Sequence, residues 1–179
     1  MMDVSPPEPI TAEHDVEAFS CGKAALDAWL KTRALANQAK GFTVGMVVHE
    51  AGRVVGYYGL APTAVVPASA PRAVRGGQPP NPVPCLLLGQ LATDRNWAVR
   101  GIGAALLGHA LRRCVLGARL IGGRAVVVNA IDAEASAFWR RRGFIAGGDD
   151  PMVLFRSIAD IAESLRLAGA TASRRRQGT

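Results

Sequence analysis

The spacing of apolar residues changes between helical and strand-like several times along the chain. Apolar positions recur at helical intervals between residues 14 and 40, with a break expected near residues 31–33, so we expect two short helices or one bent helix there. Two runs rich in valine and tyrosine follow, at residues 43–49 and 53–61. The short segment around Gly52 between them predicts a β-hairpin.

The second half of the chain alternates between apolar strands and helices. Residues 85–93 are almost continuously apolar, which is typical of a central strand buried on both faces. Residues 102–116 place apolar side chains on one helical face and His109 with two arginines on another. Gly117 and the Gly122-Gly123 pair predict the end of that helix. The remaining predicted elements are a strand at residues 124–129, a helix at 132–142 that begins at Asp132 and stops at Gly143, a strand at 152–157 and a helix at 158–167.

Two segments lack a regular period. Residues 62–84 hold most of the 11 prolines, so we expect a long loop, either a spacer or the border of a substrate groove or a dimer contact. Residues 169–179 include three consecutive arginines without apolar periodicity, and we expect this basic tail to be disordered. With residues 1–13 as an N-terminal extension, residues 14–168 then form one domain.

The composition and charge of the chain indicate which classes of protein fit the sequence. The chain has 179 residues, of which 49% are hydrophobic, and this suits a single globular domain. The net charge of +7 comes mostly from arginine, which suits a polyanionic partner but also follows from an arginine-rich composition alone. No apolar run is long enough to span a membrane, and residues 1–10 do not form a secretory signal. Three cysteines without a CxxC pair favour a reducing cytosol and no metal site.

The turn between the apolar strand and the following helix is a candidate anion site. Its sequence is Arg100-Gly101-Ile102-Gly103-Ala104, in which the glycines allow close approach of the backbone to a ligand. The free N–H groups and the positive dipole end of the helix would then face a pyrophosphate, and Arg100 would add a charge. The turn lacks the P-loop lysine and the Rossmann spacing, so ordinary turn chemistry is the alternative.

Six further segments follow one another along the chain. They are residues 19–22 (FSCG), 54–58 (VVGYY), 84–94 (PCLLLGQLATD), 129–132 (NAID), 137–139 (AFW) and 149–152 (DDPM). In this order they resemble the GCN5-related N-acetyltransferases (GNAT), and among these the acetyltransferase toxins of type II toxin–antitoxin systems, the TacT and AtaT group. The resemblance covers roughly residues 14–157. It implies a single-domain α/β (α+β) GNAT fold, with a mixed, mostly antiparallel sheet flanked by helices and acetyl-CoA bound where the central strands splay.

The resemblance also implies a reaction and partners. Family members transfer acetyl from acetyl-CoA to the α-amino group of aminoacyl-tRNA, which blocks translation, and a ribbon-helix-helix antitoxin neutralises them. A cytoplasmic homodimer is expected. An α-amino group titrates near ~8, so the reaction does not require a strong general base.

Individual site residues follow from the same resemblance. The backbone of residues 91–93 would hold the pantetheine arm and polarise the thioester carbonyl, and the turn at residues 100–104 would hold the pyrophosphate. The expected cofactor-binding residues are Leu91, Ala92, Thr93, Arg100, Gly101, Ile102, Gly103, Ala104, Asn129 and Phe138; the expected substrate-binding residues are Gln90, Arg140 and Arg141; and the catalytic candidates are Trp139 and Tyr58.

This sequence departs from the family pattern at three positions. Ala98 replaces the first residue of the pyrophosphate motif, and Gln90 stands where many relatives have arginine. Trp139 stands where relatives have a tyrosine that protonates the departing thiolate, and an indole N–H does not release a proton near neutral pH. Either the thiolate leaves with hydrogen bonding and water, or Tyr57 or Tyr58 supplies a phenol, or the protein is a weakened enzyme, an acyl-CoA binder or an enzyme with an altered substrate.

The sequence alone allows other interpretations of the arginine run and of the activity, and it assigns no catalytic role to the histidines. The run Arg140-Arg141-Arg142 would contact tRNA phosphates or simply form a solvated helix end. The three histidines, His14, His49 and His109, have no matched carboxylate or metal spacing, so structural or solvent-facing roles are expected for them. The enzymatic rival is a GNAT enzyme that acetylates a small amine or a protein N-terminus.

Overall fold

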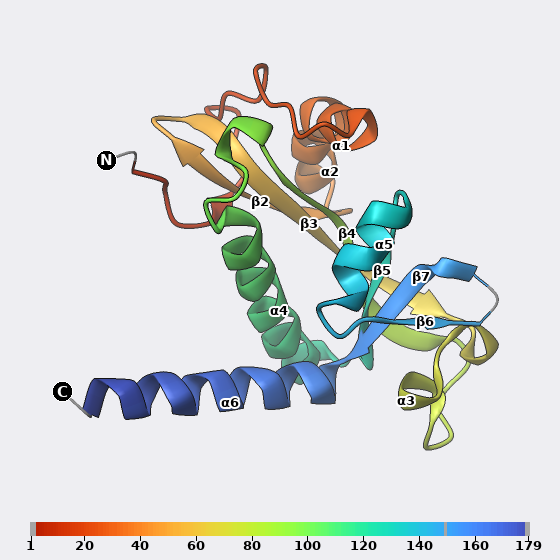
Figure 1. Cartoon of the computed structure of the whole chain (residues 1–179). Helices are drawn as coiled ribbons and strands as arrows, with labels where there is room; N and C mark the ends of the chain where they lie inside the picture. Colours follow the sequence, from red (N-terminus) through yellow and green to blue (C-terminus); the bar gives the residue numbers. More distant parts are fainter. Residues whose placement is uncertain (1–2, 149, 178–179) are drawn as a thin grey trace. The chain divides into compact units, whose positions relative to one another are not determined.

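The computed structural model describes residues 3–148 and 150–177 (Figure 1). Near its start, α1 (Ala24–Trp29), a π-helical segment (Leu30–Ala34) and α2 (Leu35–Ala39) follow one another without interruption. This confirms the bent helix, since the wider π turn coincides with the break expected near residues 31–33. Asp149, the first residue of the last resembling segment, lies outside the described residues.

A hairpin follows the bent helix. Its strands are β2 (Val44–Glu50) and β3 (Arg53–Val65), paired from Val44↔Leu60 to Glu50↔Arg53. The two connecting residues, Ala51 and Gly52, have φ of 47° and 87°, as a type I′ turn requires. The predicted hairpin is therefore confirmed, although β3 continues beyond residue 61.

The sheet has seven strands in the order β1-β2-β3-β4-β5-β7-β6. The pairing is antiparallel for β1 with β2, β2 with β3, β5 with β7 and β6 with β7, while β4 and β5 pair in parallel through Leu86↔Val126 and Leu87↔Val127. This confirms the expected mixed, mostly antiparallel sheet. The remaining elements are β1 (Glu8–Pro9), α3 (Arg72–Arg75), β4 (Val83–Thr93), α4 (Ile102–Ile121), β5 (Ala125–Asn129), α5 (Ala133–Arg140), β6 (Ile145–Gly147), β7 (Asp150–Ser157) and α6 (Ile158–Gln177).

Two compact units make up the chain, and each is described by itself. Unit 1 comprises Met1–Ala61 and Leu88–Ala110, and unit 2 comprises Pro62–Leu87 and Leu111–Thr179. In unit 1, Tyr57 is the centre of an aromatic group: it stacks on Trp29 with ring centroids 5.8 Å apart and meets the edge of Phe19 at 5.5 Å. The buried core of unit 1 includes Ile10, Phe19, Leu30, Ala34, Val47, Val54, Tyr57 and Ala92.

The proline-rich segment of unit 2 corrects an expectation. Residues 62–84 are not one long loop, because they contain the end of β3, a 3₁₀ turn (Pro67–Ser69), α3 and the start of β4. The prolines occupy positions that suit them, such as the first residue of the 3₁₀ turn. Arg124 donates from Nε to the carbonyl of Val74 at 3.1 Å, which fixes α3. The buried residues of this unit include Ala70, Val74, Val83, Cys85, Ala125, Val127 and Phe155.

The C-terminal segment corrects a second expectation. Residues 169–177, predicted to be disordered, continue α6 as a helix, while residues 178–179 lie outside the described part. The segment has no proline, six of its nine residues are alanine, arginine or glutamine, which favour helix, and its arginines suit the negative end of the helix dipole. Likewise α4 passes through Gly117 and ends before Gly122, whose φ is 89°. No described helix combines the length and apolar character needed to cross a membrane.

Candidate functional site

The turn before α4 presents backbone N–H groups. Val99 and Gly101 have positive φ, 57° and 80°, which reverses the chain immediately before the helix. Ala105 N donates to Gly101 O at 3.0 Å, so the N–H groups of the first three helical residues have no carbonyl one turn before them. These groups belong to Ile102, Gly103 and Ala104, as the sequence predicts.

The end of β4 lies beside this turn in unit 1. A Cβ atom added at Gly103 would lie 3.4 Å from Thr93 Oγ1, so two predicted cofactor-binding positions adjoin. Ala92 is buried, while Leu91 and Thr93 are half-buried. Packing against β3 fixes the helix here, because a Cβ at Gly56 would come within 2.8 Å of Leu106 Cδ1. The exposed N–H groups and the glycines fit a pyrophosphate bound through the backbone.

The side chain of Arg100 is oriented by an aromatic neighbour. Its guanidinium carbon lies 4.6 Å from the ring centroid of Trp97, a cation–π contact that orients the side chain. Trp97 is 7% exposed and anchors the 3₁₀ turn Arg95–Trp97. Arg100 itself remains exposed and can reach an anion at the turn.

Asp94 is a structural residue that sequence reasoning missed. Its carboxylate is 1% exposed and accepts hydrogen bonds from Ser20 N at 3.0 Å and Asn96 N at 2.9 Å. Arg95 Nη2 also donates to Ser20 Oγ at 2.6 Å. These bonds join two of the resembling segments, residues 19–22 and 84–94. An aspartate directly after an apolar strand was the available signal.

Gln90 lies on the same face of the sheet as Trp29. A Cβ at Gly59 would fall 2.6 Å from Gln90 Oε1 and 3.1 Å from Trp29 Cη2. The amide side chain of Gln90 therefore occupies space that only glycine leaves free on β3. This expected substrate-binding residue is half-buried.

The two tyrosines of β3 point to opposite faces, as strand geometry predicts. Tyr58 is fully buried, and its hydroxyl oxygen lies 2.7 Å from His109 Nδ1. Tyr57 donates to Leu26 O at 2.6 Å, and burial raises the pKa of its phenol. Because the Tyr58 side chain is fully buried, it offers no exposed surface to a thiolate, which counts against its expected catalytic role. The structural role expected for His109 is confirmed by its contact with this phenol.

Trp139 lies in an aromatic cluster of unit 2. It is 7% exposed, with ring centroids 5.0 Å from Phe138 and 5.1 Å from Phe144, both in edge-on geometry. Asp132 caps α5 by accepting from Ala135 N at 2.8 Å, and Gly143 follows the helix with φ of 85°, as predicted. The packing role expected for the indole is confirmed.

The three arginines after Trp139 differ from one another. Arg142 donates to Phe138 O at 3.1 Å and its guanidinium carbon lies 3.5 Å from the Phe138 ring centroid. Burial, followed by the nearby charge of Arg141, lowers the pKa of Arg142. Arg140 and Arg141 are exposed, with Arg140 Nε donating to Ser136 Oγ at 3.3 Å. Only these two combine exposure with a position beside the aromatic cluster.

The predicted site residues thus form two groups. Unit 1 brings together the end of β4 and the turn into α4. Unit 2 brings together Phe138, Trp139, Arg140 and Arg141, while Asn129 is exposed at the end of β5.

A histidine pair in unit 1 corrects the expectation of unmatched histidines. His14 Nε2 and His49 Nε2 lie 2.8 Å and 3.1 Å from the same oxygen, Glu8 Oε1. The hydrogen bond to His14 is the largest influence that lowers the pKa of Glu8. Although the three residues converge as metal ligands do, each Nδ1 accepts a backbone N–H, from Thr11 at 2.9 Å and from Gly52 at 3.0 Å. Both Nε2 atoms therefore carry hydrogen in the neutral rings, which suits a carboxylate and opposes a metal ion.

The comparisons with known proteins match this chain to an acetyltransferase family and to toxins. The family model described as the acetyltransferase (GNAT) family matches residues 9–144. A "tRNA-acetylating toxin" of Mycobacterium tuberculosis (strain ATCC 25618 / H37Rv) is 42% identical over 160 residues, which cover 89% of this chain and 96% of the relative. A solved structure of AtaT complexed with acetyl-methionyl-tRNAfMet matches at 26% identity with a TM-score of 0.81, over 93% of this chain and 99% of that one. A tyrosine-to-phenylalanine mutant of the AtaT toxin, bound to the C-terminus of the antitoxin AtaR and acetyl-CoA, matches at 27% identity with a TM-score of 0.74, over 89% and 96%.

Proposed function

Because the chain belongs to the acetyltransferase (GNAT) family, we propose that it transfers acetyl from acetyl-CoA to the α-amino group of an aminoacyl-tRNA and so blocks translation. The observation that carries this proposal is the 42% identity to a tRNA-acetylating toxin over 96% of that relative. The AtaT structure with acetyl-methionyl-tRNAfMet supports the same substrate class.

The residues of unit 1 fit the cofactor. The N–H groups at the start of α4 would bind the pyrophosphate, and Gly103 leaves the helix surface open beside Thr93. The backbone of Leu91, Ala92 and Thr93 would hold the pantetheine arm and polarise the carbonyl. Acetyl-CoA, when bound, supplies the acetyl group as an activated thioester.

The attacking amine needs little help from a base. An α-amino group with a pKa near ~8 is partly unprotonated at neutral pH, so positioning contributes more than proton abstraction. The buried phenols and the histidines bonded to Glu8 are engaged in internal hydrogen bonds. This favours a mechanism in which the chain orients the amine and does not deprotonate it.

Because Trp139 does not release a proton, water is the proposed proton source for the departing thiolate. A thiol such as that of coenzyme A has a pKa near ~8.5, so its thiolate is a competent leaving group when hydrogen bonds stabilise it. The indole N–H donates such a bond but no proton, and its aromatic neighbours keep the ring in place. The role proposed for Trp139 is therefore positioning and hydrogen bonding.

Arg140 and Arg141 are the proposed contacts to the acceptor end of the tRNA. Both are exposed, whereas Arg142 is held on the Phe138 ring. Guanidinium groups pair with phosphate oxygens in a sequence-independent way, which makes binding salt-dependent. Gln90 would contact the substrate without adding charge.

A related toxin supports an antitoxin as a partner of this chain. AtaT is bound to the C-terminus of its antitoxin, AtaR. For this chain we propose a ribbon-helix-helix antitoxin, a homodimer and a cytoplasmic location.

Incubation of the purified protein with labelled acetyl-CoA and bulk charged tRNA tests the proposal. Label in the tRNA fraction supports it. Label only in added small amines or peptides would favour an ordinary GNAT enzyme, and cofactor binding without turnover would favour an acyl-CoA binder.

A further inference from the structure

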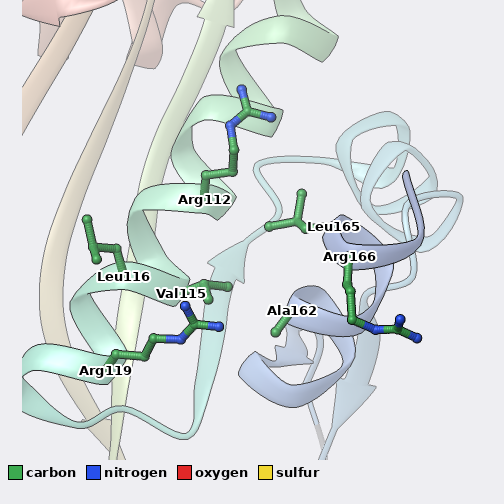
Figure 2. A pocket seen from close by; sticks show the side chains of 7 residues that line it. All are labelled: Arg112, Val115, Leu116, Arg119, Ala162, Leu165 and Arg166. Atoms are coloured by element: carbon green, nitrogen blue, oxygen red, sulfur yellow. The ribbon is translucent and has the colours of Figure 1, made fainter. Parts of the chain in front are cut away.

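A groove between two helices of unit 2 remains outside the proposed catalytic chemistry. Its volume is about 320 Å³, and Figure 2 shows its walls, the C-terminal half of α4 and the beginning of α6. Four apolar side chains and three arginines share this surface. They are Val115, Leu116, Ala162 and Leu165, with Arg112, Arg119 and Arg166.

The helix α6 is anchored only near its first turns. Ile161 is fully buried, Ile158 N donates to Arg124 O at 3.0 Å, and Arg156 binds Asp160 at 2.6 Å. Every described residue from 166 onward is exposed. Most helical stability in proteins comes from tertiary packing, so a packing partner along the groove would stabilise α6.

The two helices that form the groove carry exposed apolar side chains. Leu116, which lines the groove on α4, is 57% exposed. Leu120 and Ile121 at the end of α4 are 75% and 78% exposed, and Leu167 on α6 is 52% exposed. Exposed apolar surface can mark a protein-binding site.

The charge of the groove has one sign. The side chains of Arg112 and Arg119 have no hydrogen-bond or ion-pair partner among residues 3–148 and 150–177. Arg166 pairs with Glu163 at 2.6 Å. No acidic residue occurs in residues 111–121 or after Glu163, so Arg112 and Arg119 are available to carboxylates of another molecule.

We propose that this groove, formed by α4 and α6, binds an amphipathic helix of a partner protein whose apolar stripe is flanked by carboxylates. A third helix fills a groove between two helices through residues at i, i+3, i+4 and i+7. RNA would use the arginines but not the apolar floor, and a second copy of this chain would bring the same arginines into repulsion. Identification of the partner with the antitoxin rests on the proposed function, whereas the preference of the groove for such a helix does not.

Fluorescence anisotropy with a synthetic peptide tests this inference. The probe is a labelled, helix-forming peptide with leucine at i, i+3, i+4 and i+7 and glutamate at most other positions. We expect saturable binding to the full chain, at least tenfold weaker binding to the double variant Arg112→Glu, Arg119→Glu, and several-fold weaker binding to Leu116→Ser. The matched control, Arg72→Glu with Arg75→Glu on exposed positions of α3, changes the same charge and should bind within twofold of the wild type.

Three results would overturn the inference. They are no saturable binding of the probe, equal binding of a scrambled peptide whose leucines do not share a face, and a loss of bulk tRNA affinity in the groove variants with probe binding unchanged. Circular dichroism checks that each variant is folded. Because the binding assay needs neither acetyl-CoA nor turnover, a failure of acetyl transfer with intact probe binding would refute the proposed function and leave the groove assignment standing.

Discussion

Trp139 is the position at which the resemblance leads us to expect a tyrosine, and the indole is held there by aromatic neighbours. Phe138 and Phe144 contact its ring edge-on, and the side chain is almost fully buried. Such pairs add about 0.5–1.5 kcal/mol beyond the burial of area. The residue therefore contributes to the stability of α5 whatever its part in acetyl transfer.

Substitutions of Trp139 distinguish its contribution to stability from its part in acetyl transfer. Trp139→Ala should lower the free energy of unfolding by about 3 kcal/mol, because it leaves a cavity in the aromatic cluster. Trp139→Tyr should leave the turnover number within about threefold of the wild type if water supplies the proton. Urea unfolding and steady-state acetyl transfer measure the two effects. A gain in turnover of tenfold or more in Trp139→Tyr would show that a phenol route is accessible and lost in this chain.

For single residues, the sequence predicts the direction of a side chain on a strand but not its bonding partner. Alternation along a strand predicts that Tyr57 and Tyr58 face opposite sides, but their partners, Leu26 and His109, come from distant segments. The convergence of two histidines on Glu8 depends likewise on pairing between β1 and β2, which no local spacing reveals.

A substitution at the N-terminus of α4 tests the proposed pyrophosphate site. Gly103→Glu should weaken acetyl-CoA binding at least tenfold, since a carboxylate would stand beside the N–H groups proposed for the pyrophosphate. The fold should survive, because a Cβ at this position makes only an ordinary contact with Thr93. Gly117→Glu is the matched control, as a Cβ there has no neighbour within 4 Å. Isothermal titration calorimetry with acetyl-CoA compares them, and equal affinities would contradict the assignment.

The end of α5 is expected to act on the tRNA and not on the cofactor. Arg140→Glu with Arg141→Glu should reduce acetylation of charged tRNA at least tenfold and leave acetyl-CoA affinity unchanged, because both guanidinium groups are exposed. Arg72→Glu with Arg75→Glu controls for the change in net charge. An unchanged tRNA affinity of the first variant in low salt would refute this role.

Local signals predicted the elements whose sequence has one strong pattern. The Gly52 turn predicted the hairpin, and Asp132 with Gly143 predicted both ends of α5. The proline-rich segment was misjudged because its buried residues, such as Val74, gain their partners from β5 and β7. The tail was misjudged because its alanine, arginine and glutamine residues favour a helix even without an apolar stripe.

The half-buried thiol of Cys21 and the buried thiol of Cys114 should make the stability of the protein sensitive to alkaline pH. Burial, followed by the hydrogen bond to Asp27, raises the pKa of Cys21 to about 11, and burial raises that of Cys114 to about 12. A raised folded-state pKa stabilises the fold fully below the unfolded value near ~8.5, and this stability is lost as pH rises toward the folded value. The free energy of unfolding should therefore fall between about pH 9 and pH 11.

Urea unfolding under reducing conditions across this range measures the effect. Cys114 contributes up to about 1.4 kcal/mol per pH unit, so Cys114→Ala should show a shallower fall than the wild type. Identical slopes in the two proteins would contradict the burial of this thiol.

The net charge of +7 has a defined distribution in the structure. Arg174, Arg175 and Arg176 lie in the last turn of α6, Arg140 and Arg141 are exposed after the aromatic cluster, and Arg112 and Arg119 border the groove of unit 2. A generally basic surface steers polyanions to the protein, while the groove selects by shape as well as charge. The arginine excess thus serves two proposed partners, tRNA and an acidic helix.

The position of the transferred acetyl group tests the account most directly. The purified protein is incubated with radiolabelled acetyl-CoA and either charged or uncharged bulk tRNA, and mild base then releases the amino acid for analysis. The account predicts label in charged tRNA alone, released as an N-acetyl amino acid. Label that is absent from charged tRNA, or that appears equally in uncharged tRNA, would contradict acetyl transfer to the aminoacyl α-amino group.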